Sequence, residues 1–184
     1  MIVTVTKPEA NQPEPWLRGT LADVPAVLRA VLHALELARE DAERWCGDLT
    51  GLEVHARPVG LPSIASQLRH IAGSVDRLLT YAEGDELSQA QLADLAREAD
   101  GGTLPHLLLR EFSNSIERAS QRVRGFIGAD LETQRFVGRK RLPTTIGGLL
   151  VHVAEHTQRH VGQMITTVKV VKAARDAAIS PESR

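Results

Sequence analysis

The sequence predicts an all-α protein, a four-helix bundle with one long crossover between its second and third long helices. Four long stretches of the 184-residue chain carry apolar residues three or four positions apart, a spacing that places them on one face of a helix. The connection at residues 85–103 is too long for the tight turn that usually joins antiparallel neighbours in a bundle. A crossover of this length lets the third long helix run parallel to the second.

The N-terminal segment, residues 1–20, is predicted to be an extended arm that packs through Trp16, because it contains several prolines and no helical period. The first long helix is predicted over residues 22–45 from apolar positions at helical spacing. These positions are Val24, Leu28, Val31 or Leu32, Leu35, Ala42 and Trp45. Glycines and prolines then mark residues 47–62 as a loop.

The second long helix is predicted to begin after an N-cap at Ser63 and to end at Gly84. Its apolar stripe consists of Ile64, Leu68, Ile71, Val75, Leu78 and Ala82. The crossover that follows is predicted to contain a short helix of its own, opened by a capping box of Ser88 and Gln91.

The third long helix is predicted over residues 104–126. Its stripe consists of Leu104, Leu108, Phe112, Ile116, Ala119, Val123 and Phe126. Residues 129–143 are predicted to form a loop. The fourth helix is predicted to be capped by Thr144 or Thr145 and to extend to about Arg175, where basic residues suit a helix C-terminus.

The composition is that of one soluble domain, with 42% hydrophobic residues in 184. The predicted organisation is an arm at residues 1–20, the helical bundle at 21–176 and a tail at 177–184. A net charge of −1 and 3% aromatic residues argue against a nucleic-acid or anionic-membrane partner. No stretch approaches the roughly 20 apolar residues of a membrane span. The single cysteine, Cys46, fits a reducing compartment, so a cytoplasmic location is expected.

Two histidines of the predicted fourth helix, His156 and His160, are four residues apart. At about 100° per residue, both fall in the apolar stripe and are predicted to face the core. Two imidazoles one turn apart can share a metal ion. The alternative is that each is a core residue whose ring bonds to a carbonyl or carboxylate. The third ligand stays open among four other histidines, which are His33, His55, His70 and His106.

His152 lies on the flank of the same stripe. Together with Glu155 and His156 it matches the H-x-x-E-H pattern of inverted zinc peptidases, in which the glutamate would be the general base. Only 28 residues follow His156, too few for the third ligand and cleft of that architecture. The pattern is therefore disfavoured, as is a ferritin-like di-metal protein, because no Glu-x-x-His spacing occurs in the predicted helices.

The segment Leu68-Arg69-His70-Ile71, followed later by His156-x-x-x-His160-Val-Gly-Gln163, resembles the DinB/YfiT-like superfamily of bacterial metal-binding four-helix bundles. The resemblance extends over roughly residues 21–171 and includes the helix order and the long crossover. It implies that one histidine of the second helix and a pair in the fourth hold a divalent metal. Carried over position by position, the ligands are His70, His156 and His160.

The chain departs from the family pattern at Val161, where many relatives have arginine, and this removes a polar contact expected beside the site. Gly162 and Gln163 follow the pattern. Glycine inside a helix costs about 1 kcal/mol relative to alanine, and close helix packing is the predicted reason for keeping Gly162.

Three neutral histidines leave a coordination position open, as in catalytic zinc sites. The resemblance implies a homodimer and a metal-dependent enzyme that acts on a small molecule, either a transferase or isomerase that uses a low-molecular-weight thiol or a hydrolase. Zinc or nickel is the expected ion. No catalytic residue is predicted, because Cys46, Ser66, Ser74, Glu155 and Arg159 lack a motif for that role. The alternative is a non-catalytic bundle that binds metal or dimerises.

Overall fold

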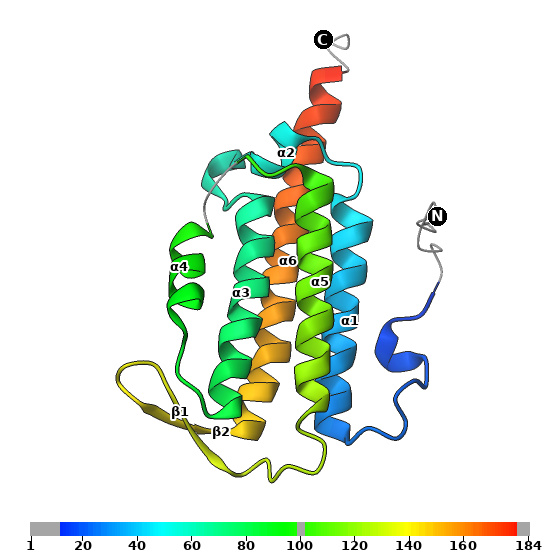
Figure 1. Cartoon of the computed structure of the whole chain (residues 1–184). Helices are drawn as coiled ribbons and strands as arrows, with labels where there is room; N and C mark the ends of the chain where they lie inside the picture. The colour runs from blue at the N-terminus through cyan, green and yellow to red at the C-terminus, as the bar shows by residue number, and fades with distance from the viewer. Residues whose placement is uncertain (1–11, 99–101, 180–184) are drawn as a thin grey trace, which may run out of the picture.

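The computed structural model describes residues 12–98 and 102–179, except for the side chains of residues 96, 97 and 179. The described chain is mostly helical, which confirms the all-α class (Figure 1). In chain order the helices are η1 (Pro15–Leu17), α1 (Ala26–Cys46), α2 (Gly51–His55), η2 (Pro58–Gly60), α3 (Ile64–Glu83), α4 (Gln89–Arg97), α5 (Pro105–Arg124) and α6 (Ile146–Ile179). Two strands, β1 (Gln134–Val137) and β2 (Leu142–Thr145), lie between α5 and α6.

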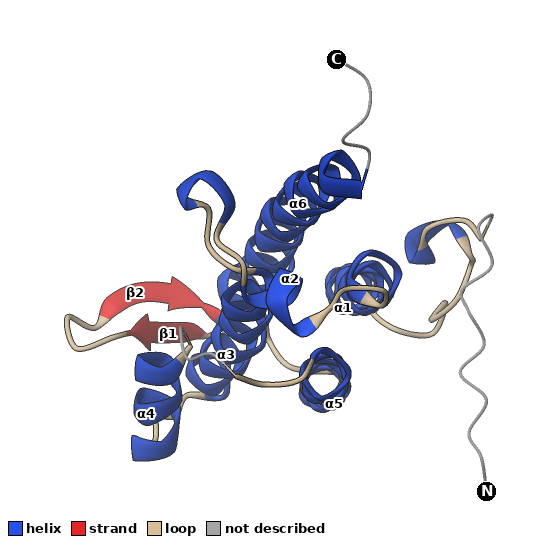
Figure 2. Cartoon of the chain, turned by 90° about the horizontal axis from the view of Figure 1, so that it is seen from above, coloured by secondary structure: helices blue, strands red, loops and turns tan. Residues whose placement is uncertain are grey.

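Four long helices, α1, α3, α5 and α6, lie side by side (Figures 1 and 2). Helices α1 and α3 each pack against both α5 and α6. Figure 1 shows α3 and α5 running in one direction and α1 and α6 in the other, so the segment containing α4 returns the chain between two parallel helices. The apolar stripes meet in one core, whose fully buried large side chains include Leu28, Leu35, Ile64, Leu68, Ile71, Leu79, Leu108, Leu150 and Met164. Among the described residues, no helix combines the length and apolar character needed to cross a membrane.

Side-chain caps fix the helix starts that position the site. The Oγ atom of Ser63 accepts from the N–H of Ser66 at 3.1 Å at the start of α3, and Gly84 ends that helix with a left-handed φ of 96°. The predicted capping box of Ser88 and Gln91 is present at α4. These ends agree with the sequence prediction and fix the length of α3.

Helix α1 begins at Ala26, four residues later than predicted. Pro25 precedes it as the N-cap, and a residue before proline is disfavoured in the helical region, so the apolar Val24 lies outside the helix. At the other end of the chain, α6 continues past Arg175 to Ile179. The first residues of the predicted tail are therefore helical.

The prediction of a loop at residues 129–143 is wrong in part, because these residues contain most of a β-hairpin. Strands β1 and β2 pair antiparallel, with Gln134 opposite Thr145. Arg135 anchors the hairpin by donating from Nε to the carbonyl of Ala82 in α3 at 2.8 Å. Strands of four residues are too short for alternation to reveal them.

Thr144 is a strand residue and does not cap α6. Its neighbour Thr145 has that role, because the Thr145 Oγ1 atom accepts from the N–H of Gly148 at 3.1 Å. The hairpin therefore leads directly into the helix that carries two of the candidate ligands.

The described part of the N-terminal arm, residues 12–20, does not pack through Trp16, whose surface is 61% exposed. Pro15 is buried instead. Arg18 attaches the arm to α1 through two hydrogen bonds of 2.7 and 2.8 Å to the carboxylate of Glu40 and one of 3.1 Å to Glu36. Residues 1–11 of the predicted arm lie outside the described part of the chain.

Candidate metal centre

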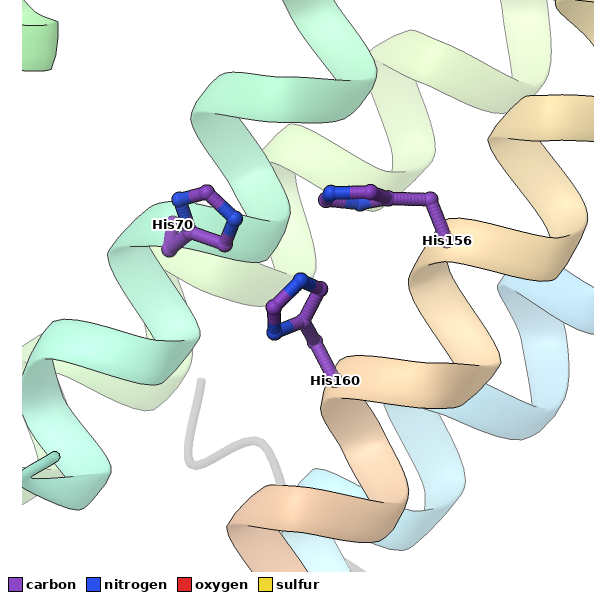
Figure 3. A group of neighbouring side chains, drawn as sticks. All are labelled: His70, His156 and His160. Atoms are coloured by element: carbon purple, nitrogen blue, oxygen red, sulfur yellow. The ribbon is translucent and has the colours of Figure 1, made fainter. Parts of the chain in front are cut away.

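His70 of α3 and His156 and His160 of α6 lie together in the structure (Figure 3). One ring nitrogen from each histidine can be chosen so that all three nitrogens lie within 4.8 Å of one another. The ring centroids are 4.4 Å apart for His156 and His160, 4.5 Å for His70 and His160, and 5.3 Å for His70 and His156. The helices α3 and α6 thus bring together the three residues that the family resemblance selected.

The histidine pair lies on the flank of the apolar stripe of α6, and the prediction that both rings face the core is wrong. The centre of the buried face consists of Val153, Thr157 and Val161, all at most 1% exposed. His156 and His160 are only half-buried. The stripe is therefore centred away from the two histidines. Their actual position opens one side of the cluster to solvent.

Val161, the position at which the chain departs from the family pattern, is a core residue. Its side chain is 1% exposed and packs in the core, so it offers the cluster no polar contact. Gly162 is exposed, and a Cβ atom built there would meet nothing within 4 Å. Close helix packing therefore does not explain this glycine.

Burial and mutual repulsion keep the two α6 histidines neutral. The pKa of His156 is lowered from 6.5 to about 4, first by burial and then by the neighbouring His160 and His70. The pKa of His160 is lowered by burial and by His70, and a side-chain hydrogen bond with Gln163 opposes this shift. Since a metal ion binds the unprotonated ring, these pKa shifts favour metal over proton.

The hydrogen bonds of the three rings differ. His70 Nδ1 lies 2.8 Å from Oε2 of Glu98, which is the residue after α4. The Nδ1 atom of His156 is buried and has no hydrogen-bond partner within the described chain. A core histidine kept for packing would have a partner, because leaving a buried polar atom unpaired costs about 1–3 kcal/mol. Within the described chain this nitrogen is available to bind an ion or to accept a hydrogen bond.

His152 is not one of the three converging histidines, although its ring centroid lies 5.5 Å from that of His156. It is exposed, and its Nδ1 atom lies 2.9 Å from Oε2 of Glu155, which also forms an ion pair with Arg159. The H-x-x-E-H residues therefore do not assemble a peptidase site around one ion, because His152 is engaged by the glutamate.

The remaining histidines lie elsewhere. His33 is buried beside Thr20, with Nε2 3.1 Å from the hydroxyl oxygen. His55 Nε2 contacts the carbonyl of Thr103 at 2.9 Å. His106 is exposed on α5. The structure therefore resolves the choice of a third cluster member in favour of His70.

The three candidate nucleophiles, Cys46, Ser66 and Ser74, differ in their surroundings. Cys46 is buried with its Sγ atom 3.8 Å from Sδ of Met164, and burial raises its pKa to about 12. Ser66 donates to the carbonyl of Ser63. Ser74 lies beside the cluster, with Oγ 3.4 Å from Nε2 of His70. The four-residue spacing of His70 and Ser74 on α3 was the available sequence signal for this contact.

A cavity of about 620 Å³ lies between α3, α4 and α5. Its apolar residues include Leu68, Leu108 and Phe112, and none of the three clustered histidines lines it. Arg77 and Glu98 belong to its wall. The cavity is therefore next to the histidine cluster and distinct from it.

The family model described as the DinB superfamily matches residues 34–164, more than two thirds of the chain. The protein belongs to this superfamily. All three clustered histidines lie inside the matched region. Searches of curated proteins and of solved structures found no match.

Proposed function

We propose that His70, His156 and His160 bind one divalent transition-metal ion, zinc or nickel, and that the protein is a metal-dependent enzyme acting on a small molecule. The observation that carries the proposal is the convergence of three ring nitrogens within 4.8 Å from two helices. Imidazole is a common ligand of both ions. The lowered pKa of His156 and its unpaired Nδ1 atom support the same reading.

Half-burial of the cluster supports a catalytic site over a closed structural one. Structural zinc sites have four protein ligands, whereas catalytic sites have three and leave a position for water or substrate. A bound ion would supply Lewis-acid chemistry, lowering the pKa of a water or thiol at that position. The chain's own part is to hold the three rings, to keep His156 neutral and to leave one side of the cluster accessible.

We favour a transferase or isomerase that uses a low-molecular-weight thiol over a hydrolase. The chain's cysteine does not supply a thiolate, because Cys46 is buried and its pKa is raised to about 12. A thiol substrate would have to come from solution. A homodimer is part of the same proposal.

The alternative is a non-catalytic bundle that binds metal or dimerises. It is favoured by the state of the two carboxylates near the cluster. Glu98 pairs with His70 and Arg77, and Glu155 pairs with His152 and Arg159. Neither carboxylate is free to act as a general base in this arrangement.

The test is elemental analysis of protein purified without an affinity tag, followed by calorimetric titration with zinc and with nickel. One ion per chain is the expected stoichiometry, and His152→Ala is the matched control, since this histidine lies on the same helix outside the cluster. Metal-loaded and chelated protein are then compared for consumption of a cellular thiol. Metal binding without consumption of any thiol or hydrolysable substrate supports the non-catalytic alternative. Absence of binding overturns the metal-dependent enzyme and leaves only the dimerising form of the alternative.

A further inference from the structure

The end of α4 delivers a carboxylate to the histidine cluster. Glu98 follows the last residue of α4, and its Oε2 atom lies 2.8 Å from Nδ1 of His70. The other oxygen, Oε1, lies 2.9 Å from Nη2 of Arg77 on α3. The side chains of Glu98 and Arg77 are only 16% and 12% exposed. Glu98 is thus held from two sides by His70 and Arg77, which lie about two turns apart on α3.

A glycine on α3 makes room for this arrangement. A Cβ atom at Gly73 would lie 2.8 Å from Nη1 of Arg77 and 3.0 Å from Oε1 of Glu98. Both distances are shorter than van der Waals contact, so any side chain there would displace the pair. Glycine in a helix interior is destabilising relative to alanine. The space beside Gly73 is occupied by the ends of the Arg77 and Glu98 side chains, and Glu98 contacts His70.

We propose that Glu98 is a positioning residue that fixes the tautomer and orientation of His70, so that His70 Nε2 serves the cluster with His156 and His160. A carboxylate only accepts hydrogen bonds, so the ring must donate from Nδ1. In the neutral ring the lone pair then lies on Nε2. Histidine ligands commonly donate their second nitrogen to a carboxylate, which raises ligand basicity.

Arg77 completes the chain of contacts. Besides pairing with Glu98, its Nη2 atom donates to Oγ of Ser74 at 3.2 Å, and that hydroxyl lies 3.4 Å from Nε2 of His70. Arg77 therefore contacts Glu98 and Ser74, two of the residues that lie against the His70 ring. The arrangement makes the crossover segment a part of the site, although its residues are far from the histidine pair in sequence.

The tautomer test uses nitrogen chemical shifts of the His70 imidazole in the metal-free protein at neutral pH. The wild type should show the Nδ1–H tautomer. Glu98→Ala should shift the ring toward a mixture of tautomers, while Glu98→Gln should retain the Nδ1–H form, because the amide oxygen still accepts. Glu86→Ala, an exposed glutamate earlier in the crossover, is the control. An unchanged tautomer in Glu98→Ala overturns the proposal.

The affinity test uses zinc alone, measured by competition with a chromophoric chelator. This part rests on the proposed metal site. Glu98→Ala should bind zinc about 10- to 100-fold more weakly than wild type, with a smaller loss for Glu98→Gln. Gly73→Ala should weaken binding in the same direction, and Gly162→Ala is its control, since a Cβ there meets nothing. Failure of wild type to bind either zinc or nickel overturns the proposed function, whereas wild-type zinc affinity in Glu98→Ala overturns the role of Glu98.

Discussion

The rings of His70 and His160 meet edge to face, with centroids 4.5 Å apart, although 90 positions separate them in sequence. Packing of α3 against α6 creates this contact. A buried hydrogen bond of 2.9 Å, from Nε2 of Gln67 to Oγ1 of Thr167, links the same two helices nearby. The candidate ligands are therefore on rigid helices, and their relative position depends on the core.

Replacing any one of His70, His156 and His160 with alanine should abolish stoichiometric binding of zinc or nickel. Each variant leaves two imidazoles, too few to hold the ion at the affinity of three. Calorimetric titration measures the effect. All three rings are half-buried, so the variants should remain folded, which far-ultraviolet circular dichroism checks. Retention of wild-type affinity by His160→Ala would contradict the site.

Only part of this site could be predicted from the sequence. The spacing of His156 and His160 is visible, because one turn of helix separates them. His70 came from the family resemblance, since helical periodicity alone placed it at a flank. The contact of Glu98 with His70 could not be predicted from the sequence, because the position of Glu98 depends on how the crossover folds back onto α3. Contacts set by tertiary packing cannot be derived from local period.

The fold, like the site, could be predicted only in part from the sequence. The long helices and their caps follow from apolar spacing and from residues such as Ser63 and Ser88. The hairpin of β1 and β2 was missed, because its strands are short and one of its anchors, the hydrogen bond from Arg135 to the carbonyl of Ala82, is set by tertiary packing. The sequence predicted that His156 and His160 lie at the centre of the α6 stripe and face the core. It therefore did not predict that one side of the cluster faces solvent.

Metal should stabilise the folded protein. An ion that binds only the folded state adds about 2.7 kcal/mol when its free concentration is a hundred times the dissociation constant. For a chain of this length the melting temperature should rise by roughly 5 to 10 °C. Differential scanning calorimetry of chelated and zinc-loaded protein measures the shift. The same comparison on His156→Ala should show no rise, and a rise in that variant would locate the ion elsewhere.

Gly162→Ala should stabilise the protein by about 0.5–1 kcal/mol without changing metal affinity. Residue 162 is inside α6, is exposed, and offers open space to a methyl group. Alanine restricts the unfolded chain and has the better helix propensity. Urea unfolding measures the gain. Destabilisation would mean that the exposed surface of α6 at this position is covered, for example by a second subunit.

Assembly is a separate prediction. Light scattering at micromolar concentration should give twice the 20.1 kDa mass of the chain. Closed two-fold dimers are the commonest homo-oligomers, and the outer faces of long helices offer the extended surface that such contacts use. A stable monomer at this concentration would exclude the homodimer. The metal-site predictions would be unaffected, because all three ligands belong to one chain.

The metal-free protein should lose stability as the pH falls from about 7 to about 5. In the folded state the pKa of His156 is lowered from 6.5 to about 4, and that of His160 is also lowered. The unfolded chain therefore binds protons first, and stability falls below pH 6.5, where the unfolded histidines begin to be protonated. For His156 the loss should be on the order of 1 kcal/mol, allowing for solvent screening of a half-buried ring.

Urea unfolding at about pH 7 and about pH 5 measures this loss, a window that lies above the titration of most carboxyl groups. In His156→Ala the difference between the two conditions should shrink, because the histidine that resists protonation in the folded state is gone. His106→Ala, which removes an exposed histidine outside the cluster, should keep the wild-type difference. An equal pH dependence in wild type and His156→Ala would show that the folded protein protonates His156 as readily as the unfolded chain does. Burial and the neighbouring rings would then not keep the His156 imidazole unprotonated and available to a metal ion.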